Sequence, residues 1–309
     1  MLNPRLIAQG PVFMPATSRD GSVMAWSNRL DETRDIFVQR GGETTRLTTD
    51  EEIDTEPTLT PEGDVLVWSR RVAGGDWDLY EANPQGEIRP LLAEPGAQRK
   101  PRFSADGSTL VFEDRGGIGI IREGEREWIA RPEGNEDSRK PRINHDGSRV
   151  FWERFDAASR TTTLWMRDQN GAEKPLLTPD HSWTGYDINR EGDKITYSVW
   201  TDEGEDLKVW DLGTNQVTEL ASKAGVNETF PAVSPDGEST IYNLVDFRTY
   251  PKVNAYIFRD KNGFKEELVT RHPTGRDLFP QVTPDGKHLH WMWIHDEDPN
   301  NRALMQAEL

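Results

Sequence analysis

An acidic residue followed by glycine recurs seven times along the chain, and this repeat constrains the fold more than any other feature of the sequence. Successive glycines are 42, 44, 40, 45, 45 and 49 residues apart, which is close to the length of a four-stranded propeller blade. An acidic residue and a glycine together favour the positive φ of a tight hairpin turn. The repeat glycines are Gly21, Gly63, Gly107, Gly147, Gly192, Gly237 and Gly286.

When the seven repeats are aligned on these glycines, two further columns of residues stand at a fixed distance from the glycine. A proline stands six positions earlier in six of the seven repeats, and Tyr186 takes its place in the fifth. We expect each proline at the entrance of a strand, where its missing N–H costs no ladder bond. An aromatic residue stands five positions later in every repeat, and we expect this column to be buried between neighbouring blades. The aromatic residues are Trp26, Trp68, Phe112, Trp152, Tyr197, Tyr242 and Trp291.

The two ends of the chain complement each other. Six repeats continue into a third and a fourth strand, whereas the last repeat reaches Leu309 after its third strand. Residues 4–9 resemble the outer strands around Leu91 and Leu176. The sequence therefore predicts an all-β fold, a seven-bladed β-propeller made as one domain from residues 1–309. An outer strand from the N-terminus would close its last blade, leaving no free edge there.

Strings such as FPAVSPDGESTIYN and EPTLTPEGDVLVWS resemble the WD40-like repeat of the TolB-like β-propellers. The resemblance covers essentially the whole chain. The chain differs from TolB in its predicted number of blades and in lacking the additional N-terminal domain of TolB. Because repeats of this type occur in peptidase-associated propellers, in oligogalacturonate lyases and in many uncharacterised bacterial proteins, the resemblance implies a fold rather than one activity.

Charge and composition narrow the classes of partner. The formal net charge is −17, which disfavours nucleic acid and anionic lipid as partners. There is no cysteine, which excludes disulfides and thiolate chemistry, and no apolar run is long enough to insert into a membrane. We expect a monomer, cytoplasmic if Met1 is the native start and periplasmic if a signal peptide has been trimmed.

The strongest candidate site is a basic sequence that occurs twice, as Arg99-Lys100-Pro101-Arg102 and as Arg139-Lys140-Pro141-Arg142, at equivalent positions of adjacent repeats. One interpretation is an anion site at the mouth of the propeller channel, with Trp183 and Tyr186 as aromatic anchors. The other is internal neutralisation by nearby acidic residues. The predicted binding residues are Arg99, Lys100, Arg102, Arg139, Lys140, Arg142, Trp183 and Tyr186.

No motif of a known catalytic site or phosphate-binding loop is present. His288 and His290 lie on one side of a predicted strand but lack a third ligand at a suitable spacing, so no metal site is predicted there. Acidic residues at 202–206 and 296–298 could hold calcium, although neither segment has the spacing of an EF-hand loop. No other cofactor is expected.

The function predicted from these observations is non-catalytic recognition of a protein segment or a small anionic ligand. Two alternatives stay open: a carbohydrate-active lyase or hydrolase of the propeller type, and an engineered or ligand-free scaffold.

Overall fold

A computed structural model describes residues 3–178, 185–246, 248, 254–261, 267–270 and 275–309. The chain divides into two compact units. Unit 1 contains residues 1–12 and 179–309, and unit 2 contains residues 13–178. No helix among the described residues is long and apolar enough to cross a membrane.

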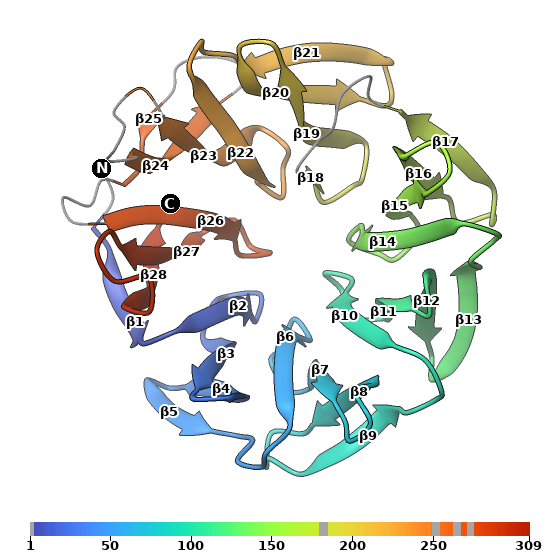
Figure 1. Ribbon diagram of the computed structural model, residues 1–309, viewed down its shortest axis with the longest axis vertical. Coiled ribbons are helices and arrows are strands. Elements are labelled where there is room, and N and C mark those ends of the chain that lie inside the picture. Colours follow the sequence, from blue (N-terminus) through green and yellow to red (C-terminus); the bar gives the residue numbers. More distant parts are fainter. Residues whose placement is uncertain (1–2, 179–184, 247, 249–253, 262–266, 271–274) are drawn as a thin grey trace. The chain divides into compact units, whose positions relative to one another are not determined.

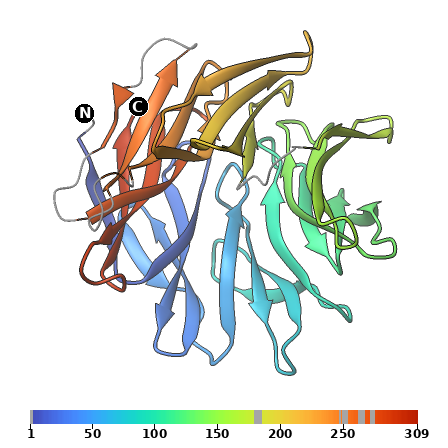
Figure 2. The ribbon, with the colours of Figure 1, turned by 45° about the horizontal axis from the view of Figure 1, so that its top comes forward.

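Unit 2 consists of four antiparallel blades, β2–β5, β6–β9, β10–β13 and β14–β17, each of which is twisted (Figure 2). A parallel bridge between Arg34 and Ile53 joins the first two blades into one eight-stranded sheet. The strands are β2 (Val12–Thr17), β3 (Val23–Leu30), β4 (Thr33–Arg40), β5 (Glu43–Arg46), β6 (Ile53–Leu59), β7 (Leu66–Arg71), β8 (Trp77–Ala82), β9 (Ile88–Leu92), β10 (Gln98–Phe103), β11 (Thr109–Asp114), β12 (Gly117–Arg122), β13 (Glu125–Ala130), β14 (Glu136–Ile143), β15 (Val150–Asp156), β16 (Thr161–Arg167) and β17 (Glu173–Leu177).

Unit 1 contains an eight-stranded sheet, β18–β25, and a four-stranded sheet in the order β1-β28-β27-β26. A parallel bridge between Glu205 and Asn227 joins the two halves of the larger sheet. The strands are β1 (Arg5–Gln9), β18 (Tyr186–Ile188), β19 (Lys194–Thr201), β20 (Gly204–Asp211), β21 (Gln216–Ala221), β22 (Val226–Val233), β23 (Ser239–Asp246), β24 (Asn254–Lys261), β25 (Glu267–Leu268), β26 (Gly275–Val282), β27 (His288–His295) and β28 (Arg302–Glu308).

The prediction of a seven-bladed propeller is wrong. The structure shows an all-β propeller fold with four blades, those of unit 2, and the described strands form five hydrogen-bonded sheets rather than seven. The number of sheets has a physical reason: the parallel bridges at Arg34 and Glu205 each merge two sequence repeats into one sheet, which leaves five sheets for seven repeats. Repeats in the sequence therefore do not correspond one to one to sheets. The assignment of residues 1–309 to a single domain stays a prediction.

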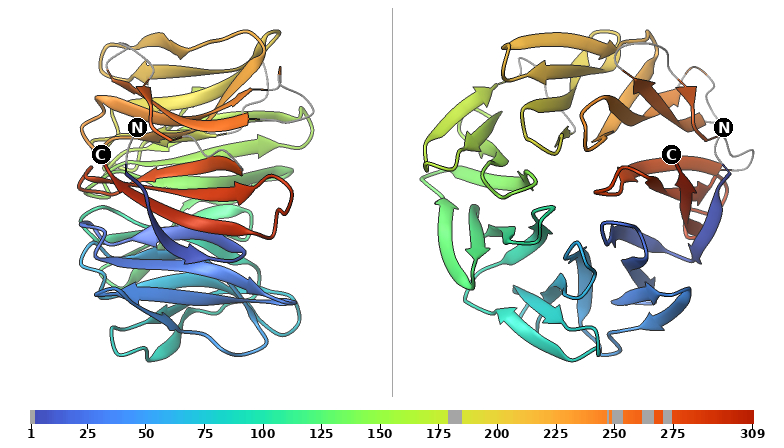
Figure 3. Two further views of the ribbon diagram at one scale, coloured as in Figure 1. Left: turned by 90° about the vertical axis from the view of Figure 1, so that its left-hand side faces the viewer. Right: turned by 180° about the vertical axis from the view of Figure 1, so that it is seen from behind.

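The predicted pairing of the chain ends is confirmed. Strand β1 lies antiparallel to β28, with Leu6 opposite Met305 (Figure 3). The side chain of Arg5 donates from Nε to Gln306 Oε1 at 2.6 Å. The amide oxygen of Gln306 is thus identified as the acceptor for Arg5. The amide nitrogen, Nε2, then donates to Nε2 of the buried His290 at 2.9 Å. Burial, together with the smaller effects of the charges of His288 and Arg5, lowers the pKa of His290 to about 3.

The aromatic column is buried, as the sequence predicts. Trp68, Trp152 and Trp291 are fully enclosed, and each packs within the apolar core of its own region. The repeat glycines all have positive φ, between 65° and 80°. Gly63 is required for a second reason, because a Cβ there would approach Val23 Cγ2 to 2.8 Å in the neighbouring blade.

Trp68 is also tied to a buried ion pair. Its Nε1 donates to Asp54 Oδ1 at 2.7 Å, and Arg70 donates to both oxygens of the same carboxylate at 2.7 Å. Asp54 has no exposed surface, and the Asp50 carboxylate lies 2.9 Å from the Arg70 guanidinium on the solvent side. The guanidinium also stacks on Tyr80, 4.7 Å from the ring centroid. Burial by itself lowers the pKa of Arg70, but the hydrogen bonds that it donates to Asp54 and the charge of that carboxylate outweigh burial and raise the pKa.

Candidate functional site

The predicted basic residues lie in unit 2 on β10 and β14, the inner edge strands of two neighbouring blades (Figure 1). Each strand contains a β-bulge, between Arg99 and Arg102 in β10 and between Arg139 and Arg142 in β14. Lys100 and Lys140 occupy these bulges with left-handed φ angles of 55° and 53°. A left-handed conformation is costly for any residue other than glycine and is further disfavoured before proline.

The prediction that the prolines mark strand entrances is wrong in this detail. Pro57, Pro101 and Pro141 lie inside their strands, directly after the left-handed residue. The bulge is the physical reason, because it removes the proline position from the regular ladder, where an N–H would be required.

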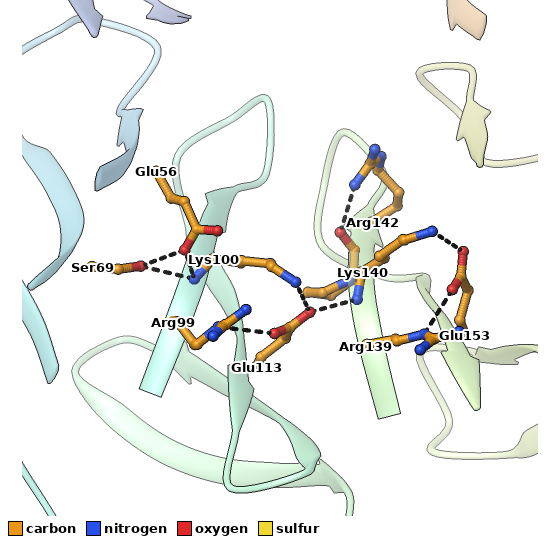
Figure 4. Close-up of polar contacts among 10 residues, drawn as sticks. Glu56, Ser69, Arg99, Lys100, Glu113, Arg139, Lys140, Arg142 and Glu153 are labelled. Carbon is orange, nitrogen blue, oxygen red and sulfur yellow. Dashed lines mark hydrogen bonds and ion pairs between the residues drawn. The ribbon is translucent and has the colours of Figure 1, made fainter. Parts of the chain in front are cut away.

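Side chains of the preceding blade hold both strained lysines by their backbone amides. Lys100 N donates to Ser69 Oγ at 2.9 Å and to Glu56 Oε2 at 3.2 Å. Lys140 N donates to Glu113 Oε1 at 2.8 Å. Such bonds over-determine the backbone and allow a strained conformation to persist. Figure 4 shows how these contacts connect three successive blades, from β6 to β15.

The basic side chains form two sets of ion pairs with the same pattern of atoms. In the first set, Lys100 Nζ lies 2.8 Å from Glu113 Oε1, and Arg99 Nε lies 3.5 Å from Glu113 Oε2. We call Arg99, Lys100 and Glu113 module A. Both cations remain about one-third exposed, whereas the glutamate is buried.

The second set, Arg139, Lys140 and Glu153, is called module B. Lys140 Nζ lies 3.0 Å from Glu153 Oε1, and Arg139 Nε lies 3.1 Å from Glu153 Oε2. The exposed fractions of Arg139 and Lys140, 36% and 38%, are close to the 37% and 31% of Arg99 and Lys100. An aromatic ring lies under each arginine: Trp77 at 5.8 Å from Arg99 and Phe155 at 5.0 Å from Arg139.

Cations and carboxylates lie side by side in this cluster. The two modules and the adjoining Arg102 and Arg142 contain six cations. The carboxylates beside them are those of Glu56, Glu113, Asp137 and Glu153. Desolvation and the negative charge of Glu113 raise the pKa of Asp137, whereas Arg139, Lys100 and Arg99 lower it.

The remaining predicted site residues lie in different surroundings. Arg102 is exposed and lies opposite Val111, and Arg142 donates to the Pro141 carbonyl at 3.2 Å. Tyr186 is on β18 in unit 1 and only 3% exposed. Trp183 lies outside the described residues.

Sequence reasoning missed the amide contacts that order the lysines. Ser69, Glu113 and Glu153 all stand directly after the aromatic residue of their repeat. The position directly after each aromatic residue is the signal from which polar acceptors next to the lysines could have been inferred.

The described residues contain no group of three His, Cys, Asp or Glu side chains arranged to hold a metal ion. In the first acidic segment proposed for calcium, Glu205 and Asp206 are buried in β20. In the second, Asp296 lies 3.8 Å from Arg276. Calcium binding stays a prediction.

No protein-family model matches the chain, and no curated protein matches it in sequence. Solved structures do resemble it. An oligogalacturonate lyase from Vibrio parahaemolyticus is 10% identical, with a TM-score of 0.73 over 99% of this chain and 93% of the lyase. An oligogalacturonate lyase in complex with manganese is 16% identical, with a TM-score of 0.72 over 100% of this chain and 93% of that one.

TolB from Acinetobacter baumannii is also similar, at 16% identity and a TM-score of 0.54 over 70% of this chain and 55% of TolB. Likeness at such low identity shows the fold alone. The resemblance to TolB-like propellers that the repeats indicated is therefore confirmed at the level of the fold.

Proposed function

We propose that this chain is a non-catalytic binding protein that recognises the carboxylate or a similar anionic group of a small ligand at modules A and B. The observation that carries the proposal is that each buried glutamate faces two cations of its own module. Within each module two partly exposed cations share one buried glutamate, and Asp137 also lies close to Arg99, Lys100 and Arg139. An anion from solution would therefore gain attraction at the exposed side of both modules.

The backbone supports this proposal because the cations are positioned before any ligand arrives. The amides of Lys100 and Lys140 are bound by the preceding blade. The arginines lie against Trp77 and Phe155. Ordering these side chains on binding costs less entropy when the fold already restricts them. These partly exposed cations also belong to a chain whose net charge of −17 repels anions from its surface as a whole.

The test compares two double variants that change the net charge equally. Lys100→Gln with Lys140→Gln removes one cation from each module and leaves each glutamate with its arginine. Lys174→Gln with Lys223→Gln removes two exposed lysines that are outside the modules. Calorimetric titration with sulfate, acetate and an oligogalacturonate measures binding at two salt concentrations, and circular dichroism checks folding.

We expect the unmodified chain and the Lys174/Lys223 variant to bind at least one of these anions, more weakly at high salt because exposed charges are screened. The Lys100/Lys140 variant should be folded and should not bind. Equal binding by the two variants, or no binding by the unmodified chain, would contradict the proposal.

A second candidate function is a lyase that acts on an acidic oligosaccharide. The similarity of the fold to two oligogalacturonate lyases over nearly the whole chain favours it. The manganese of the second structure has no fitting set of ligands among the described residues here. His290, for example, is buried and hydrogen-bonded to Gln306. Formation of an unsaturated product during the oligogalacturonate titration, followed by ultraviolet absorbance, would favour the lyase; binding without product would favour the binding protein.

A further inference from the structure

The two basic modules share one pattern of ion pairs. In each, the lysine ammonium pairs with Oε1 and the arginine Nε with Oε2 of a buried glutamate. In each, the lysine is left-handed and precedes a buried proline. The copies stand on the inner strands of adjacent blades, β10 and β14, which contact one another. An anionic group that suits the paired lysine and arginine of module A therefore suits the same pair in module B.

Glu113 fixes the spacing between the two modules. Its Oε1 accepts both from Lys100 Nζ in its own blade and from the backbone N of Lys140 in the next, each at 2.8 Å (Figure 4). A single oxygen thus joins the charged end of one module to the backbone of the other. Lys100 Nζ is therefore held close to the Lys140 backbone, while Lys140 Nζ is held by Glu153, so contacts on neighbouring blades restrict the spacing of the two ammonium groups.

From this duplication we infer that the site is divalent and that its ligand is a small linear dicarboxylate, with one carboxylate at module A and the other at module B. The inference rests on the proposed function and adds the number and spacing of the anionic groups. A ligand that spans both modules makes its second contact without a second loss of translational freedom. Because the spacing is fixed, one length of ligand fits best. Shorter ligands cannot reach both modules, and longer ones lose entropy when they bend.

The experiment titrates the chain with linear saturated dicarboxylates of increasing length and with the monocarboxylate of matching length. Solvent-exposed ion pairs of this kind contribute modestly, so we expect the best dicarboxylate to bind about fivefold more tightly than its monocarboxylate. We expect a single optimum of length. Lys100→Gln and Lys140→Gln, each alone, should reduce the affinity for that dicarboxylate to that of the monocarboxylate. Lys174→Gln serves as the control and should change neither.

The outcomes separate this inference from the proposed function. Monocarboxylates and dicarboxylates that bind within twofold of each other at every length would overturn the divalent site, while binding at the lysines would still stand. Loss of dicarboxylate affinity in one lysine variant and not in the other would also overturn it. Failure of every carboxylate to bind the unmodified chain would overturn the proposed function itself.

Discussion

Replacing Asp54 with asparagine removes a negative charge that has no contact with water and that holds three hydrogen bonds. The carboxylate accepts from Trp68 Nε1 and twice from Arg70, all at 2.7 Å. The guanidinium of Arg70 is itself only 10% exposed, so the change leaves a buried positive charge without its main partner. Breaking one side of a buried ion pair costs about 3–5 kcal/mol.

The cost for this variant should lie at the lower end of that range. Asp50 remains 2.9 Å from Arg70 and keeps part of the attraction. The asparagine oxygen can still accept from Trp68, although more weakly than a carboxylate does. We therefore expect the free energy of unfolding to fall by about 3 kcal/mol, which corresponds to roughly two orders of magnitude in the unfolding equilibrium.

Urea denaturation followed by tryptophan fluorescence measures the loss, and hydrogen exchange of the β6 and β7 amides shows whether it is local. Asp50→Asn is the matched control. Because Asp50 is about half exposed, this substitution should cost less than about 1 kcal/mol. Replacing the pair together, as Asp54→Leu with Arg70→Met, should recover part of the loss, because no uncompensated charge is then buried. A loss below about 1 kcal/mol for Asp54→Asn would refute the argument that this pair anchors the blade.

Three further outcomes are expected. Deleting residues 1–9 should expose the edge of β28 and promote self-association, seen as a larger mass in light scattering; an unchanged, equally stable monomer would contradict this. Trp152→Ala should lower the free energy of unfolding by about 3–5 kcal/mol. A loss below about 1 kcal/mol would show that the recurring aromatic residues are not a main part of the core. His290 stays neutral in the folded protein down to about pH 3, whereas the unfolded chain takes up a proton below about pH 6.5. The contribution of His290 to the free energy of unfolding therefore falls with decreasing pH, by about 1.4 kcal/mol per pH unit between about pH 6.5 and about pH 3. His290→Gln should reduce this dependence of the free energy of unfolding on pH, measured by urea denaturation at several pH values.

The candidate site could be predicted in its residues but not in its arrangement. The repeated Arg-Lys-Pro-Arg sequence identified the four cations of the modules, since equivalent positions in equivalent repeats lie on equivalent strands. The left-handed backbone of Lys100 and Lys140 could not be inferred, because the residue before a proline ordinarily favours an extended conformation. It persists because Ser69, Glu56 and Glu113 bind the lysine amides from the preceding blade. Contacts between residues distant in the sequence decide that geometry.

The sequence by itself determined the all-β class, the hairpin turns, the buried aromatic column and the pairing of the N-terminal strand with β28. All of these follow from local conformational preference or from the periodic burial of large apolar side chains, which are properties of short segments. Only the tertiary structure decided the number of blades and sheets. The Arg34–Ile53 and Glu205–Asn227 bridges join repeats without any sequence signal, because backbone groups form them and any residue supplies those groups. The charge balance of the site was likewise decided by packing, which buried Glu113 and Glu153 against two cations each.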